Sequence, residues 1–208
     1  MKIKYSGVII ASVLLLMTSL LSGCANRAAL KTYIRPAQYD APFSFNGRVS
    51  IKRGLDISNA SLRWVHNPEE EEDEILILEP LGQTIARIHR DVQGATLEAQ
   101  GRFYVSQDVE SLTQQVLGWT LPLSWLTHWI VGLPAEVKPV VLNEVNENVA
   151  EVQRDARKQV TMLKQAGWEI HYTRYASATA NSLPTRLLMK KDKLEMTILI
   201  DEWEKQQL

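Results

Sequence analysis

Cys24 is the residue with the clearest capacity for covalent chemistry, and it is the only cysteine among the 208 residues. A deprotonated thiol is a strong nucleophile, and the small residues Ser22 and Gly23 before it leave room for a processing enzyme to approach. A single cysteine cannot form a disulfide within the chain. The sequence around Cys24 therefore predicts a covalent modification of its thiol.

The other residues that often act in catalysis form no recognisable motif. The four histidines fall in separate segments, outside any His-Glu-x-x-His pattern, and they are His66, His89, His128 and His171. The sequence also has no Gly-x-Ser-x-Gly elbow and no Gly-x-x-x-x-Gly-Lys phosphate loop. We therefore expect no catalytic residues and no metal site. A hydrolase remains an alternative only if acidic residues and histidines from separate segments come together in the fold.

The segment before Cys24 has the order of a secretory signal. Lys2 and Lys4 give it a positive start, and residues 8–21 are almost entirely apolar. This apolar run is too short for a comfortable membrane span. We expect residues 1–23 to be a cleaved signal peptide; the alternative is an uncleaved anchor helix with an incidental cysteine.

The tetrapeptide that ends in Cys24, Leu-Ser-Gly-Cys, resembles the bacterial lipobox. The resemblance implies that the thiol receives a diacylglyceryl group and that the amine of Cys24 is acylated after cleavage. These covalent N-acyl and S-diacylglycerol groups are the only cofactors expected. Each buried CH₂ contributes roughly 0.8 kcal/mol, so two or three chains would anchor the protein almost irreversibly. Ala25 stands where lipoproteins of the inner membrane carry Asp, which implies an outer-membrane anchor that faces the periplasm.

The composition fits one exported domain. Removal of residues 1–23 would leave 185 of the 208 residues, with 21 basic and 24 acidic side chains. That length suffices for a single core, and the slight negative balance argues against a nucleic-acid partner. We predict a signal peptide at 1–23, a lipidated tether at 24–41 and one domain at 42–208.

The body of the chain alternates apolar and polar residues with a period of two, which is typical of half-buried strands. Gly47 lies on the apolar side of the first strand, where it indicates a bulge or room for a ligand. Short strands at such spacing predict one antiparallel sheet or a partial barrel. The predicted strands are 43–52, 58–66, 75–78, 84–88, 95–99, 102–105, 160–162, 168–173 and 194–201.

Two helices are predicted in the middle of the chain. Ser106–Leu117 begins with a capping residue and has acids in its first turn, and residues 123–131 lie between a proline and a glycine. The second helix is apolar over most of its circumference, and chiefly Ser124, Thr127 and His128 are expected to face water. Such a helix either packs over a filled sheet core or covers an apolar cavity.

Several segments resemble the LolB family of outer-membrane lipoprotein receptors and stand in the order seen in that family. They cover nearly the whole chain and are Phe43–Ile51, Glu79–Thr84, Gly118–Leu123, Trp129–Pro134, Gly167–Tyr175 and Leu194–Trp203. The resemblance implies a mainly β, α+β fold. Its expected form is an antiparallel half-barrel with a hydrophobic cavity covered by a helical lid.

The resemblance also implies what the protein does. Members of the family accept acylated lipoprotein cargo from a soluble, LolA-like periplasmic carrier and place it in the inner leaflet of the outer membrane. We expect a monomer that acts without nucleotide. The candidates for the cavity wall or lid, each of which also suits a filled core, are Trp119, Leu121, Trp125, Trp129 and Ile170.

One loop carries a residue-level expectation. In the family a leucine protrudes from a Pro-Leu-Gly loop and helps to deliver cargo, and the matching residue is Leu81 between Pro80 and Gly82. A turn leaves an apolar side chain little to pack on. Leu81 either folds back onto the domain or dips into the bilayer, which would contribute on the order of 1.5–3 kcal/mol.

The acidic run Glu69–Glu74 departs from what the family leads us to expect. It is either a solvated hairpin tip or a docking patch for a basic rim on the carrier. Its charge would also oppose the approach of anionic lipid heads to the nearby Leu81 loop.

Two other classes of protein fit the same strands. A lipocalin-like binder of a small lipid would share the cavity but ignore the carrier. A structural lipoprotein of an outer-membrane assembly would have a filled core and an exposed apolar patch or sheet edge.

Overall fold

Residues 42–79, 81–135 and 150–204 are described by the computed structural model. The strands are β1 (Phe43–Arg53), β2 (Asp56–Asn67), β3 (Glu72–Leu78), β4 (Thr84–Asp91), β5 (Gly94–Ala99), β6 (Arg102–Ser106), β7 (Glu151–Arg154), β8 (Val160–Gln165), β9 (Trp168–Tyr175), β10 (Pro184–Lys191) and β11 (Leu194–Glu204). The helices are α2 (Val109–Leu117) and α3 (Leu123–Trp129). Neither helix is long and apolar enough to cross a membrane.

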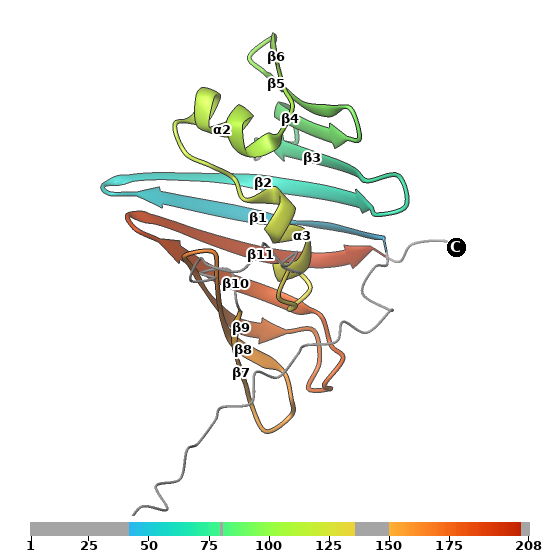
Figure 1. Ribbon diagram of the computed structural model, residues 1–208, viewed down its shortest axis with the longest axis vertical. Helices are drawn as coiled ribbons and strands as arrows, with labels where there is room; N and C mark the ends of the chain where they lie inside the picture. Colours follow the sequence, from blue (N-terminus) through green and yellow to red (C-terminus); the bar gives the residue numbers. More distant parts are fainter. Residues whose placement is uncertain (1–41, 80, 136–149, 205–208) are drawn as a thin grey trace, which may run out of the picture. The chain divides into compact units, whose positions relative to one another are not determined.

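All the described strands belong to one antiparallel sheet, in the order β6-β5-β4-β3-β2-β1-β11-β10-β9-β8-β7. The first and last strands, β1 and β11, are neighbours at its centre. Because β6 and β7 are edges that do not pair with each other, the sheet is open. Figure 1 shows both helices in front of one face of this sheet, between β6 and β7 in sequence. The predicted open antiparallel fold with helices is confirmed.

The face of the sheet beneath the helices, here called the inner face, carries the hydrophobic core. Strand register aligns apolar residues into rows that cross the sheet. One row crosses β1 to β5, is at most 4% exposed, and consists of Phe45, Trp64, Ile75, Ile88 and Leu97. Another crosses the other half through Ile170, Met189 and Met196. Because side chains alternate between faces, the polar partners in each strand lie on the opposite, outer face.

Gly47 explains the close approach of the two central strands. A Cβ atom at this position would lie 2.3 Å from the carbonyl oxygen of Leu199. The register between β1 and β11 shifts between Asn46 and Gly47. The predicted bulge is therefore confirmed, and the backbone of β11 occupies the space that the alternative assigned to a ligand.

Two strands were not among those predicted from the sequence. β7 is a four-residue edge strand with little apolar alternation, and β10 begins at Pro184 and carries two consecutive leucines before Met189. Their place is fixed by pairing with the stronger strands β8, β9 and β11. Tertiary pairing, rather than local pattern, thus defines these two elements.

Candidate functional site

α2 is fixed at both ends by local chemistry. The Asp108 carboxylate accepts a hydrogen bond from the backbone N–H of Ser111 at 2.6 Å, which satisfies a free donor of the first turn. Gly118 ends the helix with a φ of 73°, a left-handed conformation that favours glycine. The sequence prediction placed the cap at Ser106; the cap is Asp108, because only its side chain reaches the first turn.

Two side chains of α2 tie it to the start of α3. The Thr113 hydroxyl accepts from the Leu121 N–H at 2.9 Å and donates to the Val109 carbonyl at 2.9 Å. The Glu110 carboxylate accepts from the Ser124 N–H at 3.1 Å. These bonds satisfy backbone groups at the junction, so α2, the connecting segment and α3 form one hydrogen-bonded unit over the inner face.

The end of α3 is held to the sheet by buried polar groups. Gln165 on β8 accepts from Trp129 Nε1 and from the Ala135 N–H, each at 2.9 Å, and its Nε2 donates to the Ala135 carbonyl at 2.9 Å. The Tyr172 hydroxyl donates to the Trp129 carbonyl at 2.8 Å. Burial raises the pKa of Tyr172 well above its ordinary value, so the hydroxyl remains a donor. The helices thus rest on apolar contacts with few polar anchors.

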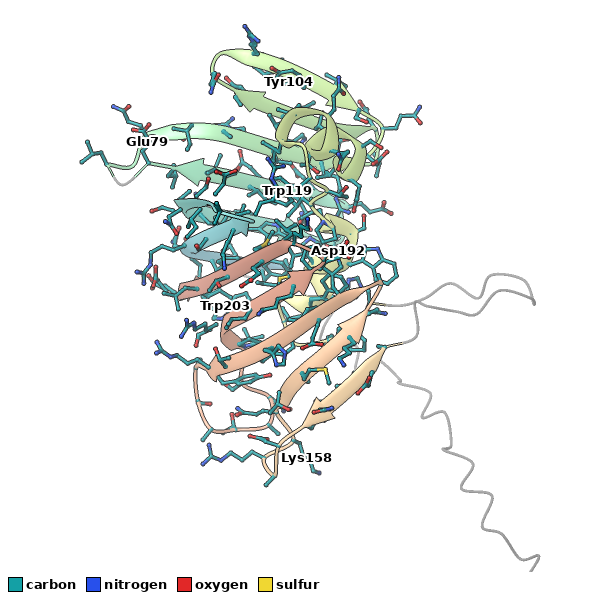
Figure 2. The ribbon with its side chains drawn as sticks, turned by 90° about the vertical axis from the view of Figure 1, so that its left-hand side faces the viewer. Glu79, Tyr104, Trp119, Lys158, Asp192 and Trp203 are labelled. Carbon is teal, nitrogen blue, oxygen red and sulfur yellow. The ribbon has the colours of Figure 1, made fainter. Side chains whose placement is uncertain are left out.

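A hollow of 420 Å³ opens where the helices meet the sheet. Its size falls within the range of small-molecule sites, about 300–1,000 Å³. Its lining includes the apolar residues Trp119, Trp125, Trp168 and Leu194 and the exposed cations Arg53 and Lys191. Figure 2 shows Trp119 and Asp192, two residues of this lining, on the same side of the sheet.

The structure divides the five cavity candidates into two groups. Trp119 and Trp125 are partly buried and line the 420 Å³ hollow. Leu121, Trp129 and Ile170 are at most 8% exposed and belong to the packed core. The helices therefore lie directly on the apolar inner face in this conformation. The assignment of these residues to a cargo cavity stays a prediction.

One residue that was predicted to lie on the polar face of α3 is buried in the structure. Thr127 was expected to face water but is 7% exposed. Its hydroxyl donates to the Ser124 carbonyl at 3.3 Å and lies 3.0 Å from His128 Nδ1. This hydroxyl can be buried because its hydrogen-bond partners lie within its own helix.

Leu81 lies at a tight turn between β3 and β4 and is 90% exposed. The Gly82 N–H donates to the Glu79 carbonyl at 2.8 Å, and the Glu79 N–H donates to the Gln83 carbonyl at 2.9 Å. Gly82 has a φ of 84°. The Leu81 side chain therefore points outward and does not fold back onto the domain. Pro80 and the predicted lipidation site Cys24 lie outside the described residues.

The acidic run does not form a single solvated tip. Asp73 is fully buried on the inner face, where its carboxylate accepts from Trp64 Nε1 at 2.7 Å, pairs with Arg90 and lies 2.9 Å from His66 Nδ1. Burial alone would raise the pKa of Asp73, but the hydrogen bond with His66 and the charge of Arg90 outweigh it and lower the pKa. Glu69, Glu70 and Glu71 at the turn are exposed.

The sequence pattern gave no indication of the structural roles of Asp73 and Gln165, or of the hydrogen bond from the Tyr172 hydroxyl to Trp129. Gln165 and Tyr172 each occupy an inward position of a strand that is otherwise apolar. A polar residue at an inward position is the available signal, since such a group is buried only with hydrogen-bond partners.

An open antiparallel sheet whose apolar face is covered by two short helices defines a half-barrel protein. Comparison with known sequences then gives the family. The family model described as outer membrane lipoprotein LolB matches residues 41–203. Because this match spans most of the chain, the protein belongs to the LolB family and is an outer-membrane lipoprotein.

Individual relatives carry the same description. An outer-membrane lipoprotein LolB of Chromobacterium violaceum is 38% identical over 194 residues, which cover 92% of this chain and 97% of the relative. A namesake from Nitrosomonas europaea is 31% identical over 82% of this chain and 79% of its own length. Among solved structures, a LolA superfamily protein of Nitrosomonas europaea aligns over 81% of this chain and 88% of its own, with a TM-score of 0.48 and 9% identity.

Proposed function

We propose that this protein accepts acylated lipoproteins from a LolA-like periplasmic carrier and inserts them into the outer membrane. The observation that carries the proposal is the apolar inner face beneath two short helices in a chain of the LolB family. The acyl chains would enter at the hollow beside Trp119 and Trp125 and displace the α2–α3 unit from the core. Trp129, Leu121 and Ile170 would then line the opened cavity.

The energetics of transfer favour such a device. A triacylated cargo carries roughly 45 CH₂ groups, each contributing about 0.8 kcal/mol when buried. Release into water would therefore cost tens of kcal/mol, so the chains must pass from one apolar cavity to another. The receptor needs only an affinity between those of the carrier and the membrane. Aromatic and aliphatic walls suit this task because they accept many cargo proteins without specific polar contacts.

The protein's own anchor would keep it at the point of delivery. We infer that Cys24 carries the N-acyl and S-diacylglycerol groups and that residues 24–41 form the tether. Leu81, which is 90% exposed at the β3–β4 turn, supports a role in delivery because nothing in the described chain covers it. The monomeric state and the lack of enzymatic activity stay predictions.

The experiment uses a soluble form that lacks residues 1–23 and carries Cys24→Ala. This form is mixed with carrier that holds a fluorescently labelled lipoprotein, and the label is followed by size separation. We expect the label to move to this protein and then to added vesicles. If the label stays on the carrier while the protein takes up an apolar dye, the protein is a small-lipid binder instead. If the protein takes up neither the dye nor the labelled lipoprotein, the remaining alternative is a structural lipoprotein of an outer-membrane assembly.

A further inference from the structure

The outer face of the sheet, which the helices do not cover, has a second hollow of 530 Å³. It spans β1, β2, β9, β10 and β11. Outward-pointing side chains that line it include Arg48, Arg174, Arg186, Ser61, Thr197 and Leu199. Its residues alternate with the inward-facing core residues Met196, Ile198 and Ile200 of β11. This hollow is therefore separate from the one beside Trp119.

Strand register brings three arginines into one row of this hollow. Arg48 pairs with Leu199, Leu199 also pairs with Arg186, and Arg186 pairs with Arg174. Arg174 and Arg186 are thus direct cross-strand neighbours, with no residue between them. Like charges in this arrangement destabilise a sheet.

Several other cations on this face are paired with acidic side chains. Arg48 forms a bidentate ion pair with Asp201, in which Nε donates to Oδ2 at 3.0 Å and Nη2 donates to Oδ1 at 2.6 Å. Further ion pairs join Lys52 and Lys190 to Glu195, Arg63 to Glu204, and Lys164 to Glu169. By contrast, neither Arg174 nor Arg186 has an acidic or hydrogen-bonding partner among the residues that the structure describes. The hollow therefore contains two uncompensated guanidinium groups.

We propose that this hollow binds a phosphate group, supplied by inorganic phosphate or by the headgroup of a phospholipid. An anion between Arg174 and Arg186 converts the repulsion of the pair into two attractive contacts. Guanidinium groups match phosphate oxygens in paired hydrogen bonds. The Ser61 and Thr197 hydroxyls supply further donors around the same space. This proposal does not depend on the receptor function.

The position of the hollow suits a membrane-bound source of phosphate. In Figure 2 the hairpin end at Glu79 projects away from the side on which Trp119 and Asp192 lie. The exposed Leu81 is two residues further along this hairpin. A bilayer that approached from the outer-face side, toward which this hairpin end projects, would therefore present its phosphates to the arginine pair.

The test uses the full lipidated protein in a maltoside detergent, which contains no phosphate. Binding is measured by titration with inorganic phosphate, with dihexanoyl phosphatidylglycerol, and with dihexanoylglycerol as the matched lipid without phosphate. The variant is Arg174→Gln/Arg186→Gln. Arg157→Gln, an exposed charge in the β7–β8 turn, is the matched control. Both altered arginines are exposed, so the fold is retained; the melting temperature of each variant checks this.

We expect wild type and Arg157→Gln to bind phosphate equally, and the double variant to bind it at least about tenfold more weakly. Without ligand, the double variant melts at the same or a higher temperature, because the like-charge pair is removed. Tighter binding of the phospholipid than of phosphate identifies the membrane as the source; the reverse identifies the free ion. Equal affinity of wild type and double variant, or binding of dihexanoylglycerol alone, overturns the proposal.

Discussion

Leu81 is an apolar residue that the described structure leaves 90% exposed. Its turn is closed by backbone hydrogen bonds, so the side chain contributes nothing to the hairpin itself. Burial of a leucine contributes about 1.5–3 kcal/mol, which is available to a bilayer because the domain does not use it. The side chain is therefore free to act in delivery.

Leu81→Glu is expected to leave stability within about 0.5 kcal/mol of wild type, because the residue is 90% exposed. It should impair delivery of labelled lipoprotein into vesicles without reducing uptake from the carrier. Val92→Glu is the matched control, since Val92 is 73% exposed in the β4–β5 turn. Delivery by Leu81→Glu at the wild-type rate would show that Leu81 has no role in delivery.

Asp73 is the opposite case, a charged residue that the fold depends on. Asp73→Asn leaves the Arg90 guanidinium without its carboxylate partner, and removal of one partner of a buried pair costs about 3 kcal/mol or more. Urea unfolding should show this loss, whereas Glu70→Gln in the exposed turn should change stability by less than about 0.5 kcal/mol. An equal effect of the two variants would contradict the structural role of Asp73.

The same carboxylate predicts a pH dependence. Because the pKa of Asp73 is below its ordinary 3.8 in the folded protein, its ionised form stabilises the fold above that value. This contribution is lost as the pH falls below 3.8 toward the folded pKa. The stability difference between wild type and Asp73→Asn should therefore shrink over this range, measured by urea unfolding at each pH. A constant difference would show that ionisation is not its source.

At the scale of elements, the period of two predicted most strands, and both helices were placed within a few residues. β10 escaped prediction because Leu187 and Leu188 interrupt its alternation, and β7 because four residues carry too little pattern. Of the candidate sites, exposure of Leu81 followed from its turn. The outer-face arginine row could not be predicted, since Arg48, Arg174 and Arg186 meet only through the pairing of distant strands.

Gln165 is expected to control how firmly α3 rests on the sheet. Gln165→Leu removes the hydrogen bonds to Trp129 Nε1 and to the Ala135 N–H and carbonyl, which leaves these groups unsatisfied and should destabilise the protein by about 2–3 kcal/mol. Hydrogen exchange should rise in α3 more than in α2, whose cap and Thr113 bonds remain. Gln153→Leu on β7 is the exposed control. Unchanged exchange in α3 would show that Gln165 is not its anchor.

Across the whole domain, the antiparallel order separates the acidic turn from the turn that carries Leu81. The β2–β3 turn with Glu69–Glu71 and the β3–β4 turn with Leu81 lie at opposite ends of β3. Seven residues at about 3.4 Å each place them roughly 24 Å apart. This separation exceeds the Debye length of about 8 Å at physiological salt. Salt therefore screens most of the repulsion expected between the acidic turn and anionic lipid heads near Leu81.

Neutralising the turn tests this separation. The triple variant Glu69→Gln/Glu70→Gln/Glu71→Gln should bind anionic vesicles within about twofold of wild type at physiological salt, measured by co-sedimentation. Glu79→Gln, which lies beside Leu81, is the comparison and should increase binding more. A larger gain in the triple variant would place the acidic turn at the membrane.

Photo-crosslinking would show whether cargo acyl chains enter beneath the helices. A photoreactive phenylalanine analogue replaces Trp125 at the 420 Å³ hollow, or Leu188 on the outer face, and labelled lipoprotein is supplied by the carrier. We expect an adduct between the cargo acyl chain and position 125, and none at position 188. Transfer of cargo with no adduct at position 125, or with equal adducts at both positions, would contradict it.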